Sequence, residues 1–147
     1  MALYKALEPL KRLMEKLSNI EDLIIDVLND LEFEIEQYQR DQLSDGLLSD
    51  GNLITPKYSR NTKRIKAQDP RYNAPFGTPN LLDSGDFYDS ILADVSKKFI
   101  DITATDSKLS KLTNKYSDKI LGWNEETKKD FCSEILGPAI VERLKNI

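Results

Sequence analysis

Apolar side chains recur at helical spacing through the first 44 residues of the chain. Leucine or methionine stands at every third or fourth position from Leu3 to Leu17, and isoleucine, leucine and valine continue this spacing from Ile20 to Ile35. Such a period places the apolar side chains along one face of an α-helix. We therefore expect residues 1–44 to form either an antiparallel helix pair or one long, broken helix.

Two local signals mark where these helices should start. Pro9 has no amide N–H and its ring clashes with the preceding turn, so a helix should begin near Pro9 or kink there. Ser18 and Glu21 have the spacing of a capping box, in which each side chain hydrogen-bonds the other residue's amide. A second helix is therefore predicted to begin at Ser18.

Alternation of apolar and polar side chains predicts a small antiparallel sheet further along the chain. Ile91–Val95 and Phe99–Thr103 both alternate, and Lys97-Lys98 lies between them at the expected turn. Side chains two residues apart share one face of a strand. The apolar face is expected to hold Phe87, Ile91, Ala93, Val95, Ile100, Ile102 and Ala104.

Helical signals return after this hairpin. Asp106 or Ser107 is placed to cap a helix running from Lys108 to Leu121, and Asn124 is placed to cap a final helix. Pro138 should break or kink that last helix. Its buried face is expected to comprise Phe131, Ile135, Ile140, Val141 and Leu144.

Residues 45–79, between the predicted N-terminal helices and the predicted hairpin, show no regular spacing of apolar positions. The turn signals Asp45-Gly46 and Asp50-Gly51 end the helical region, and residues 53–79 hold four of the six prolines. Thr62–Lys66 is expected to form one helical turn, and the rest a long loop. So long a loop in a small domain is usually functional or an arm that contacts a partner.

These patterns predict an α+β fold in a single domain, residues 1–147. Helices occupy residues 1–44, a proline-rich basic loop or arm residues 45–79, and a β-hairpin with C-terminal helices residues 80–147. No apolar run approaches the roughly 18 residues that a membrane helix needs. We expect a cytosolic start and no contact with a membrane.

Charge is distributed unevenly along this acidic chain. The net charge is −4, with −7 on residues 1–50, +5 on residues 51–71 and −2 on residues 72–147. The basic segment mixes cations with aromatic rings, a combination that contacts phosphates and stacks on bases. Because the whole chain is acidic, which weakens affinity for DNA, pairing with the acidic helix surface of residues 21–50, within one subunit or between neighbours, explains this segment better. The interaction candidates are Lys57, Tyr58, Arg60, Lys63, Arg64, Lys66, Arg71 and Tyr72.

The sequence contains no complete catalytic or metal-binding motif. It has no histidine, which removes the usual general base and the commonest transition-metal ligand. Asp83, Asp86 and Asp89 have a spacing that can serve magnesium binding or acid–base chemistry, but nothing nearby completes a site, so turn capping explains them better. Cys132 is the single cysteine and is expected to be a small core thiol. We expect no enzymatic activity, no cofactor and no metal.

Asn80–Ile91 is best explained as a structural turn. Leu82 anchors its start, and Ser84 lacks the histidine that a nucleophilic serine needs. Gly85 permits the turn because glycine adopts conformations closed to other residues. Phe87 should then begin the apolar face of the sheet. We expect this segment to act as a latch at the end of the basic arm.

Three segments, in order, carry a resemblance to a known family. They are Gln42–Gly46 with Asp50-Gly51, Ile54–Ser59, Thr62 and Lys66; then Leu82–Ser90; then Leu112–Tyr116 with Ile120–Trp123 and the helix after it. Together they resemble small tail-completion or virion-morphogenesis proteins of tailed bacteriophages, over residues 42–147. Those proteins usually have threonine before the glycine of the turn, where this chain has Ser84, so the hydroxyl is kept.

The resemblance implies a structural subunit of a ring at the head–tail junction or the tail end. Such proteins bind neighbouring copies and adjacent neck, portal or tail proteins, lie close to DNA without reading its sequence, and catalyse nothing. They are found in the virion and, during assembly, in the host cytoplasm. The alternative is a small cytosolic nucleic-acid-binding or regulatory protein that uses residues 57–72.

Overall fold

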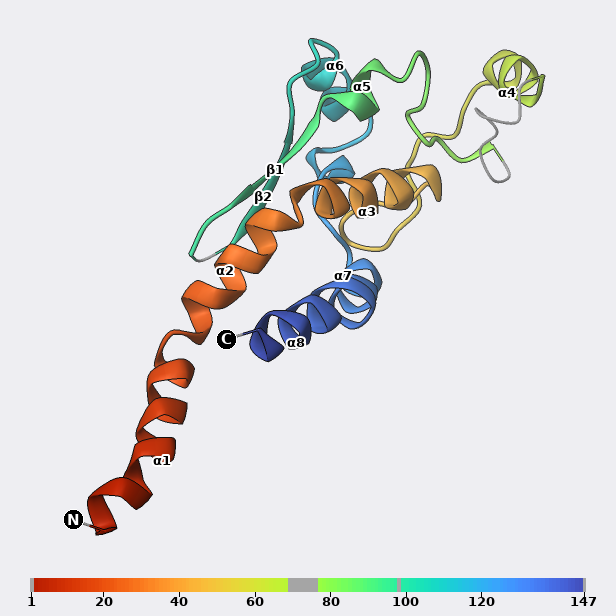
Figure 1. Cartoon of the computed structure of the whole chain (residues 1–147). Helices are drawn as coiled ribbons and strands as arrows, with labels where there is room; N and C mark the ends of the chain where they lie inside the picture. The colour runs from red at the N-terminus through yellow and green to blue at the C-terminus, as the bar shows by residue number, and fades with distance from the viewer. Residues whose placement is uncertain (1, 69–76, 98, 147) are drawn as a thin grey trace.

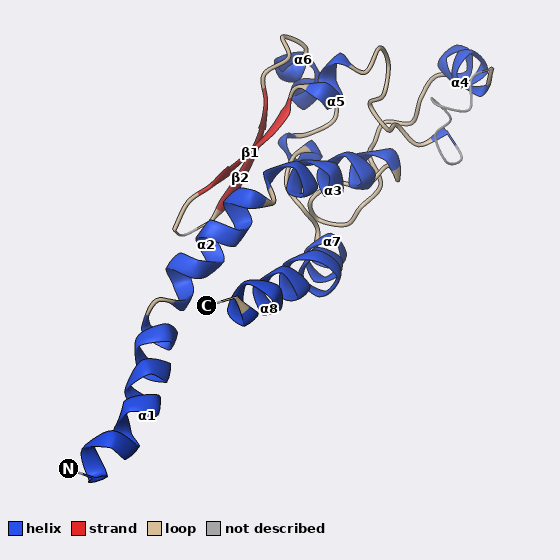
Figure 2. Cartoon of the chain, in the orientation of Figure 1, coloured by secondary structure: helices blue, strands red, loops and turns tan. Residues whose placement is uncertain are grey.

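The structure is a computed structural model that describes residues 2–68, 77–97 and 99–146, with side chains from Leu7 onward. It has the predicted α+β class, with helices at both ends of the chain and a two-stranded antiparallel sheet (Figures 1 and 2). No helix in these ranges is both long enough and apolar enough to cross a membrane. The elements in chain order are α1 (Ala2–Ser18), α2 (Ile20–Asp30), α3 (Glu32–Ser44), α4 (Arg60–Ala67), α5 (Asp86–Asp89), β1 (Ile91–Val95), β2 (Ile100–Ala104), α6 (Leu109–Lys115), a 3-10 turn (Asp118–Ile120), α7 (Glu125–Phe131), a π-helical turn (Cys132–Leu136) and α8 (Gly137–Lys145).

The first three helices form a long, broken helix. Single residues, Asn19 and Leu31, separate them, and one residue is too short a connection to reverse the chain. The expectation of an antiparallel helix pair is therefore wrong, and the broken-helix alternative is confirmed. Figure 1 shows α1 and α2 following one another along one diagonal, with α1 extending away from the rest of the chain.

The helix start predicted near Pro9 is wrong, whereas a second helix does begin next to Ser18, at Ile20, without the predicted capping side chain. Pro9 lies inside α1, which begins upstream at Ala2. Ser18 ends α1 and its Oγ donates to the Glu15 carbonyl oxygen (2.7 Å), so the hydroxyl does not cap the next helix. The residue before α2 is Asn19, and it makes no side-chain capping bond.

The hairpin has the predicted strands and the predicted apolar face. Antiparallel pairing runs from Ile91 opposite Ala104 to Val95 opposite Ile100. Residues of the predicted face are buried or half-buried, and the side chains between them are exposed. Helix α3 supports β1 with polar groups: Glu36 Oε1 accepts from the Ala93 amide (3.2 Å). This bond satisfies a donor on the strand edge that faces away from β2.

The hydrophobic core gathers residues from both halves of the chain around α3, the hairpin and the connecting turns. Phe87 belongs to this core, but it lies in the short helix α5, so the prediction that Phe87 begins a strand is wrong. The buried core residues are Leu43, Leu48, Ile54, Leu81, Phe87, Ile91, Ala104 and Ile120.

The middle segment is more structured than its sequence indicates. Helix α4 has two turns where one was expected, and its N-cap Ser59 accepts a hydrogen bond from the Thr62 amide (3.2 Å). Leu47 and Leu53 pair as an isolated antiparallel bridge around the Asp50-Gly51 turn. The prediction that residues 45–79 form a nearly continuous loop is therefore wrong for this part of the segment.

The C-terminal helices are shorter and more interrupted than predicted. Asn124 caps α7 as expected, with its Oδ1 accepting from the Thr127 amide (2.8 Å). The expected helix over 108–121 ends at Lys115 and resumes only as a 3-10 turn. The chain forms a π-helical turn before Pro138, which has no amide to donate to the carbonyl four residues earlier.

Two burial predictions in this region are also wrong. Cys132 is exposed, so it is not a core thiol. Val141 and Leu144 are 51% and 42% exposed, although Phe131 on the same face is buried. The π-helical turn adds a residue to the helical period, which shifts the apolar face after it away from the position that an unbroken helix would give.

Candidate interaction site

The turn at Leu81–Ser90 holds an unusual backbone. Gly85 has φ of +95° and Leu81 has φ of +59°, both in the left-handed region. Leucine rarely adopts that region, and such residues persist only when their surroundings hold them. Leu81 is buried in the core, and Ser84 Oγ accepts from the Asp86 amide (3.3 Å). The turn is therefore held at both ends.

A buried asparagine joins this turn to the basic segment. The Asn80 amide (3.3 Å) and the Leu81 amide (3.0 Å) both donate to Tyr58 Oη. Lys66 Nζ donates to Asn80 Oδ1 (3.2 Å) and to the Leu82 carbonyl oxygen, and it lies 4.9 Å from the centre of the Tyr58 ring. These contacts fix α4 against the turn.

Burial changes the titration of the side chains in this cluster. It raises the pKa of Tyr58 and lowers the pKa of Lys66. It also raises the pKa of Tyr88, whose hydroxyl donates to the Asn80 carbonyl oxygen. The two phenols therefore stay neutral and serve as hydrogen-bonding groups of the fold.

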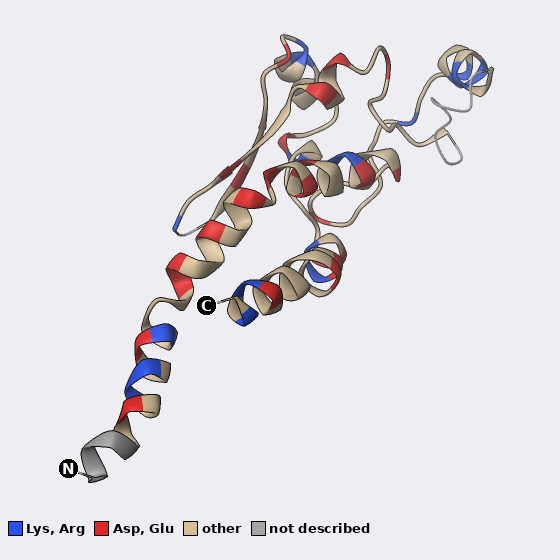
Figure 3. Cartoon of the chain, viewed as in Figure 1, with Lys and Arg blue, Asp and Glu red and all other residues tan. Residues whose placement is uncertain are grey.

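The predicted interaction residues accordingly divide into two groups. Tyr58 and Lys66 are committed to contacts within the chain. The exposed cations are Lys57, Arg60, Lys63 and Arg64, which we call the basic arm (Figure 3). Arg71 and Tyr72 lie outside the described residues. Three members of the arm, at positions 60, 63 and 64, are spaced to share one face of α4.

An acidic cleft lies between α3 and the α7 region. It encloses about 310 Å³, and its carboxylates are exposed. They are Asp41, Asp45, Glu126, Asp130 and Glu134. Tyr38 lies within the cleft and its Oη donates to Glu134 Oε2 (2.6 Å).

The negative charge of the cleft acts on Tyr38. The bond to Glu134 is the largest cause, followed by burial and by the charges of Glu134, Asp130 and Asp41, and together they raise the Tyr38 pKa to about 12. A phenol close to carboxylates resists losing its proton, because these carboxylates would repel the negative charge of the phenolate. The acidic cleft is therefore a region of negative potential suited to cations.

The remaining polar candidates do not converge on a chemical site. Among the described residues, no group of three aspartate, glutamate or cysteine side chains is placed to hold a metal ion. Asp83 Oδ2 lies 3.9 Å from Lys108 Nζ, and Asp86 and Asp89 are exposed in α5. Within the described ranges, these aspartates contribute to the turn and to the protein surface.

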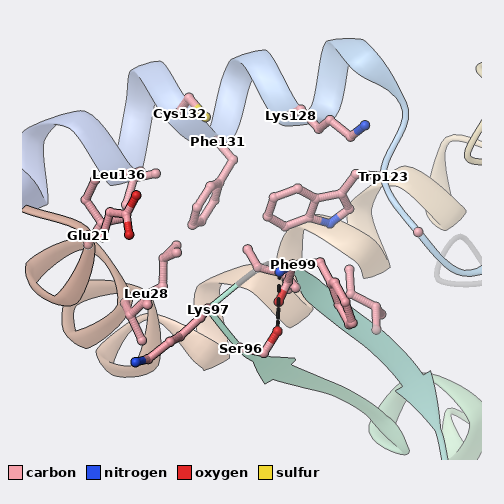
Figure 4. A pocket seen from close by; sticks show the side chains of 15 residues that line it. Glu21, Leu28, Ser96, Lys97, Phe99, Trp123, Lys128, Phe131, Cys132 and Leu136 are labelled. Carbon is pink, nitrogen blue, oxygen red and sulfur yellow. Dashed lines mark hydrogen bonds between the residues drawn. The ribbon is translucent and has the colours of Figure 1, made fainter.

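An apolar groove is the feature that sequence reasoning missed. It encloses about 510 Å³ between α2, the tip of the hairpin and the helix that follows Trp123 (Figure 4). Trp123 and Phe131 lie within it with ring centres 4.8 Å apart. Its other apolar lining residues are Ile24, Ile25, Leu28, Phe99, Ile100, Ile102 and Leu136. Helical spacing signals each apolar face but not which faces meet, so sequence could not reveal the groove.

In comparisons with known proteins, no protein-family model, curated protein or solved structure matches the chain.

Proposed function

We propose that this protein is a structural subunit of a neck or tail-completion ring in a tailed bacteriophage. Identical copies would form the ring and contact adjacent neck, portal or tail proteins. The observation that supports this most is the separation of opposite exposed charges on one chain: the basic arm at α4 (Figure 3) and the acidic cleft between α3 and the α7 region. Closed rings arise when one patch meets a different patch on the next copy.

The contacts of the turn support the same proposal. Asn80 and Leu82 hold Lys66, so α4 has a defined position relative to the core. A charged helix that is fixed in place loses less conformational entropy on docking than a flexible loop would. The basic arm is in this way suited to reach the acidic cleft of a neighbouring copy.

The test of this function is the composition of the virus particle. We expect peptides of this protein in purified virions, in several copies per particle by quantitative mass spectrometry. Capsid and portal proteins serve as internal standards. Particles with normal tails and no copy of this protein would contradict the proposal.

Nucleic-acid binding is a second candidate, because the basic arm is exposed. The contacts of Tyr58 weaken this candidate, since its hydroxyl is tied to the Asn80 and Leu81 amides and its ring faces Lys66. If the protein binds nucleic acid through the basic arm, the wild type should bind DNA with a steep dependence on salt. Arg60→Gln, Lys63→Gln and Arg64→Gln together should then abolish this binding. No DNA binding by the wild-type protein at low salt would eliminate this candidate.

A further inference from the structure

We propose that helix α1 of one copy of this protein docks in the apolar groove of a second copy. The inference rests on the proposed self-association and names the surfaces that produce it. Both surfaces belong to the same chain, and neither is covered within the described part of that chain.

Helix α1 presents a broad apolar face. Its described members are each between 50% and 62% exposed, and they are Leu7, Leu10, Leu13, Met14 and Leu17. They fall at the a, d and g positions of a heptad. A two-helix coiled coil uses only a narrow a/d stripe, whereas a face this broad is typical of a helix packed against a wider surface.

The groove presents an apolar surface that is built from more than one element. Its walls come from three elements, represented by Leu28 on α2, Phe99 beside β2 and Phe131 at the end of α7 (Figure 4). Phe99 is 65% exposed although it borders this cavity. An inserted helix would bury the ring of Phe99 together with the leucines of α1, and burial of apolar surface drives association.

The connection at Asn19 prevents α1 from entering the groove of its own chain. The Asn19 amide donates to the Lys16 carbonyl oxygen (3.3 Å), and the Leu23 amide donates to the Asn19 carbonyl oxygen (3.0 Å). The first bond ends α1 and the second begins α2, so a single residue connects the two helices. Two antiparallel helices need a connection of about two to five residues. Because α1 extends away from its own groove (Figure 1), the docked helix comes from another copy.

Charge favours the same arrangement. Helix α2 borders the groove and carries four acidic and no basic side chains. In residues 7–18 of α1, three cations outnumber two carboxylates; they are Lys11, Arg12 and Lys16. Lys97 and Lys128 line the other walls of the groove. A second α1 that lies along α2, and not beside these lysines, would therefore bring unlike net charges together, which favours and orients association.

Cross-linking tests the contact directly, because Cys132 is the only cysteine and is exposed in the groove. Protein carrying Met14→Cys and Cys132→Ser is mixed with unmodified protein and treated with a short bis-maleimide. We expect a heterodimer joining position 14 of one copy to Cys132 of the other. The matched control, Lys16→Cys with Cys132→Ser, places the thiol on the polar face and should give at least about tenfold less product.

A charge-neutral pair of variants tests the energetics. Leu10→Gln with Met14→Gln should raise the dissociation constant at least about 100-fold, since each apolar side chain loses its burial. Glu8→Gln with Arg12→Gln introduces the same residue on the other side of the helix without changing the net charge, and it should change the dissociation constant less than about threefold. Sedimentation measures association, and emission of the single Trp123 reports occupancy of the groove. Circular dichroism should be unchanged in both variants.

Several results would overturn the inference. One is a wild-type protein that stays monomeric at every concentration; another is an oligomer that survives Leu10→Gln with Met14→Gln. A third is linkage of position 14 only to position 14 of a second copy, which would indicate pairing of α1 with α1. The composition of virions is independent of all three results, so failure of this inference and failure of the proposed function are distinguishable.

Discussion

At the scale of single residues, the turn after Leu82 depends on a backbone conformation that few residues adopt. Gly85 has φ of +95°, and a Cβ added there would meet no atom within 4 Å. The positive φ of Gly85, and not a lack of space, therefore limits which residues this position accepts. Ser84 beside it is exposed and needs only its hydroxyl to accept from the Asp86 amide.

Substitutions at this turn should separate conformation from size. Gly85→Val should lower the free energy of unfolding by about 2 kcal/mol, because a β-branched side chain is disfavoured in the left-handed region. Gly85→Asn should cost less, since asparagine tolerates that region. Ser84→Thr should stay within about 0.5 kcal/mol of wild type. Urea unfolding measures all three, and equal losses for valine and asparagine would contradict this explanation.

Tyr38 makes stability depend on pH in the alkaline range. Its pKa rises from 10.0 to about 12 on folding, so the folded state holds this proton more tightly than the unfolded state. The resulting stabilisation is complete below pH 10 and is lost as the pH rises towards 12. Tyr38→Phe removes the group, so the stability difference between wild type and variant should shrink across this window. A constant difference in urea unfolding from pH 9 to 12 would refute this.

At the scale of elements, two buried glutamines on α3 hold the chain before α7. Gln39 Oε1 accepts from the Gly122 amide (2.8 Å), and Gln42 Oε1 accepts from the Asn124 amide (2.8 Å). The Gln42 amide group also donates to the Gly122 carbonyl oxygen (2.8 Å). The two side chains thus bond the backbone of the connection that leads into α7.

Loss of either glutamine should weaken the whole domain. Gln39→Ala and Gln42→Ala should each lower the free energy of unfolding by about 2 kcal/mol, because buried backbone groups would lose their partners. Gln37→Ala, on the exposed face of the same helix, should cost less than about 0.5 kcal/mol. Chemical denaturation distinguishes them, and a Gln42→Ala variant as stable as Gln37→Ala would contradict the role assigned to these bonds.

At the scale of the whole molecule, the basic arm and the acidic cleft should act as a pair. Arg60→Glu, Lys63→Glu and Arg64→Glu together should weaken self-association at least tenfold, and rising salt should weaken the wild type in the same direction. Asp41→Lys with Asp45→Lys should also weaken it. Mixing the two reversed proteins should restore association between unlike copies. Analytical ultracentrifugation measures this, and no recovery in the mixture would rule out this pairing.

Much of the local structure could be predicted because it depends on neighbouring residues. The strands around Ala93 and Ile102 follow from alternation, and the start of α7 follows from the capping side chain of Asn124. The errors arose where local signals compete with distant contacts. Ser18 had the spacing of a cap, but its hydroxyl bonds backward to Glu15. Phe87 was expected in a strand, but the left-handed Gly85 leads into a helical turn.

The candidate sites depended more heavily on tertiary contacts. Exposed cations at positions 60, 63 and 64 were predictable from charge, because charged side chains remain in water unless they are paired. The commitment of Tyr58 and Lys66 to Asn80 was not predictable, since these residues are separated by 22 and 14 positions. The acidic cleft likewise combines α3 with the α7 region, and no periodicity indicates that they are adjacent.

The sequence by itself determined the α+β class, the hairpin with its apolar face, the uneven charge and the amphipathic character of α1. Each follows from residues a few positions apart, where backbone geometry sets the spacing. Only the tertiary structure decided that α1 leaves its apolar face open, that an apolar groove lies beside α2, and that Asn80 fixes the basic arm. Those features depend on which surfaces contact each other, and that is determined by packing between segments that are far apart in the sequence.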